Sequence, residues 1–228
     1  FADVLKPKAI MLENVPGLAA YQPFKRLCAQ LRARGYHVEF SVKDAADFGV
    51  PQRRRRLILL AGYGQALPFA RPTKRKKTVR DAIGRLPPPE RSRDKLHRLG
   101  ERRSLKVQEL IRDIPKDGGS RTDLPPARQL ECHKNTDGFN DIYGRMAWDK
   151  VAPTITSGCF NPSKGRFLHP VCDRTITLRE AALLQGFPRS YEFELSGGKQ
   201  AIALMIGNAL PPEFIRRHAS EISKALGY

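Results

Sequence analysis

Residues 8–15 read KAIMLENV, and the turn pair Pro16-Gly17 follows at once. An apolar run that ends in a turn is typical of a buried β-strand that leads into a helix. This run delivers Glu13 and Asn14 to its C-terminal end, where open α/β sheets usually bind substrate. We therefore predict an α/β fold, with Glu13 and Asn14 as candidate site residues. Taken alone, Glu13 could equally be an ordinary exposed carboxylate at a turn.

The residues after the turn predict a helix. Its apolar positions recur at helical spacing and are Phe24, Leu27, Cys28 and Leu31. Pro23 suits the first turn of this helix, and Gly35 suits the cap at its C-terminal end.

Two further strands are predicted downstream. Residues 38–42 alternate between apolar and polar side chains, and residues 57–61 form a continuous apolar run. A helix between the first two strands predicts that they are parallel, whereas a connection of about a dozen irregular residues favours an antiparallel third strand. The third strand then starts at the edge where the first one ends. Residues 52–56 (QRRRR) should face the same crevice as Glu13, unless this arginine run is only a solvated strand end.

The net charge of +18 is concentrated in one part of the chain. Residues 51–106 hold 18 Lys and Arg against four acids. A basic stretch of this density favours a polyphosphate partner such as a nucleic acid, with a solvated flexible face as the alternative. The candidate phosphate contacts are Arg53, Arg55, Lys74, Arg75, Lys76 and Lys77.

The cysteines indicate a reducing compartment, and we expect a cytoplasmic protein. They are Cys28, Cys132, Cys159 and Cys172, with no CxxC pair and no secretory signal ahead of them. The pairs His169/Cys172 and Cys132/His133 lack the usual spacing of zinc ligands, so no metal site is predicted. No apolar run approaches the roughly 20 residues that span a bilayer.

The chain divides by composition into an α/β part (1–63), a separate loop-rich domain (64–172) and closing elements (173–228) that return to the first core. Within the loop-rich part we predict short helices at 79–86 and 105–113, and a strand at 152–156.

The closing elements predict two helices. Thr177 and Glu180 have the spacing of a capping box ahead of an apolar run, which should stop near Gly186. We interpret this pair as capping rather than catalytic, and Arg179 as a structural ion-pair partner. The last helix starts at residues 211–212 (PP) and ends near residue 227.

Four segments in order resemble the later motifs of the DNA cytosine-5 methyltransferases. They are ENV at 13–15, PQRRRR at 51–56, RTITLREAALLQGFP at 174–188 and GNALPP at 207–212. The match covers both ends of the chain and leaves a basic insert where that family keeps its target-recognition domain.

The resemblance implies the C-terminal part of a Rossmann-like sheet that uses S-adenosylmethionine, plus a smaller loop-rich recognition domain that binds double-stranded DNA. Residues 1–63 would then be a partial catalytic domain, residues 64–172 the recognition domain and residues 173–228 the return to the catalytic domain. In that family the motif at Asn208 and Ala209 closes over the cofactor. The resemblance also implies a bacterial protein of a restriction-modification system.

The resemblance further implies roles at the opening strand. Methylation of cytosine C5 needs a nucleophile at C6, a proton or hydrogen-bond donor at N3, and a base swung out of the duplex. Glu13 matches the family's partner of N3, with Asn14 beside it. Arg54 and Arg56 match the arginines that hold the flipped cytosine and the catalytic loop, where a planar charged fork suits base and phosphate oxygens.

The chain departs from the family in one respect. None of its cysteines lies in a Pro-Cys-Gln segment, and it has no early Phe-x-Gly-x-Gly turn, so we expect both motifs upstream of Phe1. We therefore expect no methyl transfer by this chain alone, and a missing N-terminal half or subunit as partner. The alternatives are a non-catalytic DNA-binding or specificity subunit, one half of a split methyltransferase, and a general RNA-binding domain. Residues 135–145 have aromatic and amide side chains suited to base contacts, or form a packed loop.

Overall fold

The structure is a computed structural model that describes residues 2–129 and 141–228. Its contacts divide the chain into two compact units, Phe1–Lys76 with Pro211–Tyr228, and Lys77–Leu210. The first contains α1 (Ala2–Leu5), β1 (Ala9–Asn14), the 3-10 turn η1 (Pro16–Ala20), α2 (Gln22–Ala33), β2 (Tyr36–Asp44), the 3-10 turn η2 (Ala45–Phe48), β3 (Arg55–Tyr63) and α9 (Pro212–Ala225). The second contains α3 (Val79–Ile83), α4 (Lys95–Arg98), α5 (Leu105–Asp113), α7 (Leu178–Gln185) and α8 (Gly198–Asn208), with short 3-10 turns between them.

The sheet of the first unit has the strand order β1-β3-β2, and β3 is antiparallel to both neighbours. The prediction that the first two strands run in the same direction and the third against them is confirmed, although β3 lies between them. The register pairs Asn14 with Leu57 and Asp44 with Arg55, so β3 begins where β1 and β2 end. This places the arginine run at the same end of the sheet as Glu13.

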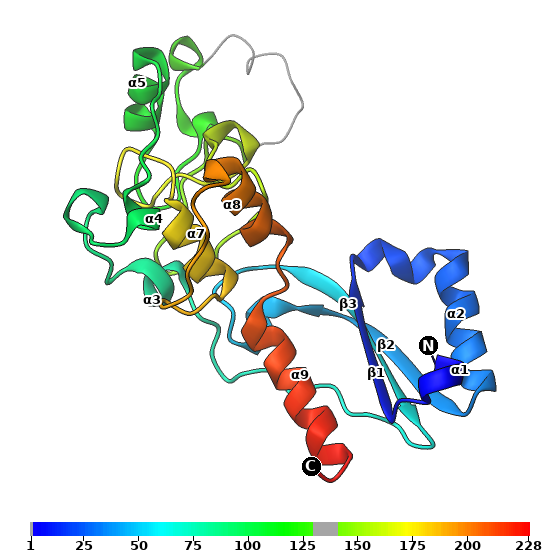
Figure 1. The fold of residues 1–228 in the computed structure, drawn as a ribbon. Coiled ribbons are helices and arrows are strands. Elements are labelled where there is room, and N and C mark those ends of the chain that lie inside the picture. The colour runs from blue at the N-terminus through cyan, green and yellow to red at the C-terminus, as the bar shows by residue number, and fades with distance from the viewer. Residues whose placement is uncertain (1, 130–140) are drawn as a thin grey trace. The chain divides into compact units, whose positions relative to one another are not determined.

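One face of this sheet packs against α2, and Figure 1 shows α9 on the opposite side. The residues of β3 from Leu57 to Ala61 are at most 1% exposed, as expected for a continuous apolar strand covered on both faces. Leu27 and Phe40 share the predicted apolar patterns but are 36% and 40% exposed. Phe40 still packs on the side of α2, with its ring 5.0 Å from that of Phe24.

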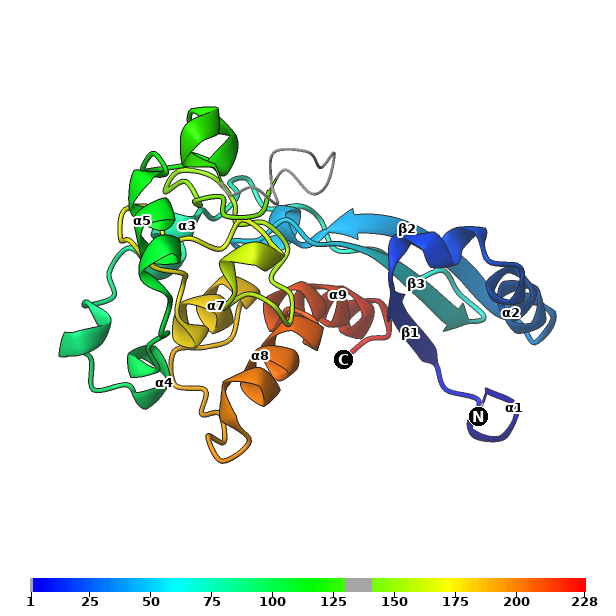
Figure 2. The ribbon, with the colours of Figure 1, turned by 90° about the horizontal axis from the view of Figure 1, so that it is seen from above.

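The second unit packs its helices around a core that joins α3, α4, α7 and α8 (Figure 2). The predicted helix over 105–113 is confirmed, and α3 is shorter than predicted. The predicted strand at 152–156 is wrong, because Ala152 alone makes an isolated bridge there. Pro153 follows directly and has no backbone N–H to extend a ladder. The helix α8 was not predicted.

The unit boundaries differ from those expected at residues 63/64 and 172/173. Residues 64–76 stay bound to the first unit: the Thr73 amide donates to the Asp47 carbonyl (2.7 Å), and the Gly64 amide to the Gly35 carbonyl (3.0 Å). At the other boundary, α7 packs on α3, α4 and α8. The chain therefore re-enters the first unit at Pro211.

Candidate active site

An ion pair joins Glu13 to Arg56 at the end of the sheet. Glu13 lies opposite Ile58, and Arg56, two residues before Ile58, points to the same face of β3. The Arg56 Nε is 2.8 Å from the Glu13 Oε1, and both side chains are partly exposed. The structure thus brings together two of the predicted catalytic residues, in a position that solvent reaches.

Arg54 extends this charged group inward. Along residues 52–55 the side chains alternate: Gln52 and Arg54 are buried, whereas Arg53 and Arg55 are exposed. Burial and, to a smaller extent, the charge of Arg56 lower the pKa of Arg54 to about 10, with the Glu13 carboxylate opposing both effects. At neutral pH Arg54 is therefore a charged guanidinium held within the electrostatic field of the Glu13–Arg56 pair.

Asn14 has a local role in the turn. Its Oδ1 accepts a hydrogen bond from the amide of Val15 at 2.8 Å, and the residue is exposed. A side chain that binds the next backbone amide stabilises the chain reversal after β1. Asn14 lies next to Glu13 at the C-terminal end of β1, as predicted.

The predicted phosphate contacts are exposed. Arg53, Arg55 and residues 74–77 all present their side chains to solvent. The Lys76 Nζ lies 2.8 Å from the Asp47 carboxylate, and this hydrogen bond raises the pKa of Lys76. Part of the charge of this basic segment is therefore neutralised within the chain.

Asn208 and Ala209 lie in the second unit, at the C-terminal end of α8. The buried Gln185 of α7 holds this end: its Nε2 donates to the carbonyls of Ile206 (2.8 Å) and Ala209. A Cβ on Gly207 would lie 2.2 Å from the backbone nitrogen of Ser157, so the helix end packs directly on another backbone segment. Asn208 itself is exposed at this fixed turn.

The start of α7 carries the predicted capping box. Thr177 accepts from the amide of Glu180, and Glu180 accepts from the amide of Thr177 (2.7 Å). Arg174 adds a two-pronged contact to the Glu180 carboxylate at 2.7 and 2.8 Å. Burial opposes the charge of Glu180, but the Arg174 hydrogen bonds hold the pKa of this carboxyl below its ordinary value. Arg179 pairs with Asp94, so the structural interpretation of these residues is confirmed.

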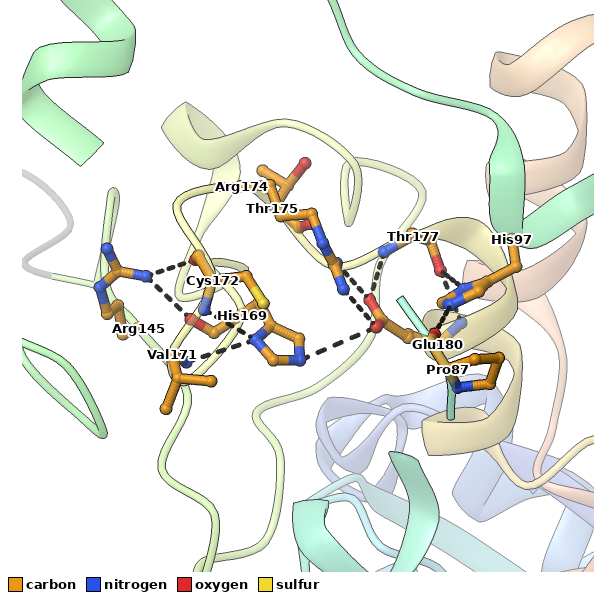
Figure 3. A network of polar contacts seen from close by, with 10 residues as sticks. All are labelled: Pro87, His97, Arg145, His169, Val171, Cys172, Arg174, Thr175, Thr177 and Glu180. Carbon is orange, nitrogen blue, oxygen red and sulfur yellow. Dashed lines mark hydrogen bonds and ion pairs between the residues drawn. The ribbon is translucent and has the colours of Figure 1, made fainter. Parts of the chain in front are cut away.

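Two histidines flank this capping box (Figure 3). The His97 Nδ1 is 2.7 Å from the Thr177 Oγ1, and the His169 Nε2 is 3.8 Å from the Glu180 carboxylate. Burial lowers the pKa of His169 to about 4, although the Glu180 charge favours the protonated ring. The His169 Nδ1 accepts from the amide of Cys172 at 3.0 Å, so the pair that suggested zinc forms a structural turn.

Arg145 ends the segment 135–145, and its burial with that of Tyr143 agrees with the packed-loop alternative at this end, although its role as a polar centre was not predicted. Its side chain is 0% exposed. Its guanidinium donates to four main-chain carbonyls and one carboxylate, those of Ile111, Ile114, His169, Cys172 and Asp173. Figure 3 shows Arg145 beside the turn that contains Cys172. No periodicity marks this residue, because its partners come from segments far apart in sequence.

Two of the described cysteines lack the access that a nucleophile needs. Cys28 and Cys159 are buried, and burial raises the pKa of the Cys159 thiol to about 12. Cys172 is exposed at the turn after Pro170. Cys132, together with residues 135–140 of the predicted base-contact segment, lies outside the described residues. Within the described ranges, no helix combines the length and apolar character needed to cross a membrane.

Comparison with known proteins matches most of the chain to one family. Residues 2–224 match the family described as C-5 cytosine-specific DNA methylase. The chain is 38% identical to the type II methylase M.HgiDII of Herpetosiphon aurantiacus, over 97% of the chain and 66% of that relative. It is 31% identical to the type II methyltransferase M1.BsuMI of Bacillus subtilis, over 92% of the chain and 49% of the relative. In fold it resembles a prophage-encoded protein of E. coli, with a TM-score of 0.68 at 20% identity, covering 98% of this chain and 72% of that one. The chain thus spans about half to two thirds of the length of these two type II relatives.

Proposed function

Because this chain belongs to the C-5 cytosine-specific DNA methylase family, we propose that it is part of an enzyme that methylates cytosine C5 in duplex DNA. The methyl donor of this family is S-adenosylmethionine. The observation that carries the proposal is the Glu13–Arg56 ion pair beside the buried Arg54, at the open end of the sheet. We propose a role in type II modification, as the names of the relatives suggest.

The chemistry assigns distinct tasks to these side chains. The cytosine is swung out of the duplex, and its N3 must gain a proton or a hydrogen bond as C6 is attacked. Glu13 is the partner of N3, and Arg56 fixes the orientation of its carboxyl group. Arg54 and Arg56 offer planar forks of donors to the base and to phosphate oxygens.

The end of α8 is the part of the cofactor site that this chain supplies. When bound, S-adenosylmethionine provides the methyl group. Asn208 and Ala209 would contact it from a turn that Gln185 and the backbone at Ser157 hold in place. An exposed amide on a fixed turn suits the polar groups of a nucleoside, which supports this assignment.

The absence of a Pro-Cys-Gln segment from the sequence supports an enzyme whose catalytic residues are divided between two parts. We propose that the 228 residues transfer no methyl group by themselves, and that an N-terminal half supplies the thiolate and most of the cofactor site. The same observation favours a second candidate function, a non-catalytic DNA-binding or specificity subunit.

A methyl-transfer assay separates these functions. The purified chain, given methyl-labelled S-adenosylmethionine and duplex DNA, should transfer no label, and the N-terminal half added in trans should restore transfer. Robust transfer by the chain alone contradicts the proposed division. DNA binding without transfer, in the presence of that half, favours the specificity subunit.

The residue roles are tested in the restored enzyme. Glu13→Gln should lower the rate by at least about 100-fold, as expected for loss of a positioned proton donor. Glu39→Gln is the matched control, because Glu39 is an exposed carboxylate on β2. Equal rates for the two variants would exclude Glu13 from the chemistry.

A further inference from the structure

The carboxylate of Asp44 binds backbone amides near both ends of the connection between β2 and β3. Asp44 is the last residue of β2 and lies opposite Arg55. Its Oδ1 accepts from the amide of Ala46 at 3.1 Å and from the amide of Arg54 at 2.9 Å. The Ala45 amide in turn donates to the Arg54 carbonyl at 3.0 Å. The backbone of Arg54 is thus held on both its N–H and its C=O before β3 begins.

The loop between these hydrogen bonds is an interior segment. Ala45, Ala46, Phe48 and Val50 are at most 1% exposed. The Gly49 backbone lies in the left-handed region, with φ of 84°, which favours glycine. A loop in which most residues are buried has few alternative positions, so its contacts determine where Arg54 lies.

Helix α9 supports the loop from the other end of the chain. The ring of His218 is fully buried and lies 5.0 Å from the Phe48 ring and 4.9 Å from the Phe214 ring. Burial lowers the pKa of His218, so the ring is neutral at pH 7, and its Nδ1–H donates to the Phe214 carbonyl at 2.9 Å. A Cβ placed on Gly49 would lie 3.7 Å from the Glu213 Cγ. Helix α9 therefore packs against both the 3-10 turn and the glycine of the loop.

We propose that Asp44 and His218 are positioning residues for Arg54. Asp44 fixes the Arg54 backbone directly, and His218 acts through Phe48, which anchors the loop between them. The inference rests on the proposed function, because Arg54 is assigned to the flipped cytosine there. The inference adds Asp44, at the end of β2, and His218, on α9, to the residues that matter for the reaction. Neither contacts the substrate, but both determine where Arg54 lies.

Amide hydrogen exchange tests the direct contact in the full 228-residue chain. Asp44→Ala should speed exchange of the Arg54 amide by about tenfold or more, as expected for loss of a hydrogen bond to a charged group. Asp44→Asn keeps an acceptor oxygen and should restore most of the protection. The Leu59 amide in the middle of β3 should be unchanged in both. Unchanged Arg54 exchange in Asp44→Ala, or equal loss in both variants, overturns the role of Asp44.

A double-mutant cycle tests the link to α9. His218→Ala should also speed Arg54 exchange, and its effect should shrink when Asp44 is already Ala, because both act through one loop. Where His218→Ala does not fold, His218→Gln serves in its place. Fully additive effects, or no effect at Arg54, overturn the role of His218.

Methyl transfer by the restored enzyme gives the functional readout. Asp44→Ala should lower kcat with little change in the KM for S-adenosylmethionine, and Asp44→Asn should recover the rate. Equal rates for Asp44→Ala and the wild-type enzyme overturn the positioning role. If the wild-type chain never supports transfer, the proposed function fails, whereas the exchange experiment still decides what holds Arg54.

Discussion

His169 occupies an unusual electrostatic position for an imidazole. It is buried among polar groups, accepts backbone hydrogen bonds on Nδ1, and faces the Glu180 carboxylate with Nε2. A nearby carboxylate normally favours the charged ring, but here burial outweighs it and the pKa falls to about 4. The neutral ring is therefore the form that the fold requires.

This predicts a loss of stability in mild acid. Between pH 6.5, where an unfolded histidine titrates, and pH 4, the unfolded chain binds a proton at this position that the folded chain does not. The free energy of unfolding should fall by about 3 kcal/mol from His169 across this window. His169→Asn, which keeps an acceptor near Nδ1 but does not titrate, should remove this part of the slope. Urea unfolding of both proteins at pH 7, 5.5 and 4.5 measures it, and parallel curves would show that His169 does not contribute.

Helix α8 depends on a close approach between two backbones. The end of the helix lies against Thr156 and Ser157, with no room for a side chain at Gly207. Gln185 satisfies carbonyls at the same helix end, where carbonyls have no partner within the helix. The turn that carries Asn208 is therefore fixed by packing and by a buried amide.

Gly207→Ala should lower the free energy of unfolding by about 1–3 kcal/mol, the usual cost of overpacking a filled site. Gly17→Ala is the control, because nothing lies within 4 Å of a Cβ at Gly17. Denaturant titration of both variants measures the difference. If the proposed cofactor contact is correct, Gly207→Ala should also weaken binding of S-adenosylmethionine by the restored enzyme. Equal stability of the two variants would contradict the close approach.

Neighbouring residues were sufficient to predict an element where their pattern fits only one kind of secondary structure. The strand that presents Glu13, the buried run of β3 and the Thr177 capping box all rest on neighbouring residues. Helix α8 was missed because residues 201–206 (AIALMI) form a continuous apolar run with no polar face to set a helical period. Arg145 was missed because its role exists only after distant carbonyls meet. The placement of the arginine run at the same end of the sheet as Glu13 was foreseen because connection length determines strand direction, but the ion pair between Glu13 and Arg56 was not.

At the scale of the whole molecule, the basic residues 74–77 are exposed, and their effect on DNA binding should be collective. Replacing residues 74–77 (KRKK) with Ala should weaken binding to every duplex sequence and reduce the dependence of affinity on salt, by about 0.9 in logarithmic slope for each lost phosphate contact. Lys76→Ala should change this slope less than Lys74→Ala, because Asp47 already pairs with Lys76.

Fluorescence anisotropy titrations over a range of NaCl concentrations measure both effects. Arg26→Ala is a suitable control, because Arg26 is an exposed cation on α2 outside the proposed DNA contacts. A changed preferred site in the fourfold variant would mean that these residues read bases rather than phosphates.

The buried guanidinium of Arg145 has a consequence for how this unit can vary. Four of its five partners are main-chain carbonyls, at Ile111, Ile114, His169 and Cys172. Every residue type carries a main-chain carbonyl oxygen. The hydrogen bonds of Arg145 therefore hold these segments together whatever side chains the segments carry. Exposed positions around it are free to change chemically while the backbone beneath them keeps its course. In a protein domain whose binding surface changes during evolution, such backbone contacts would keep the fold intact while the surface residues are replaced.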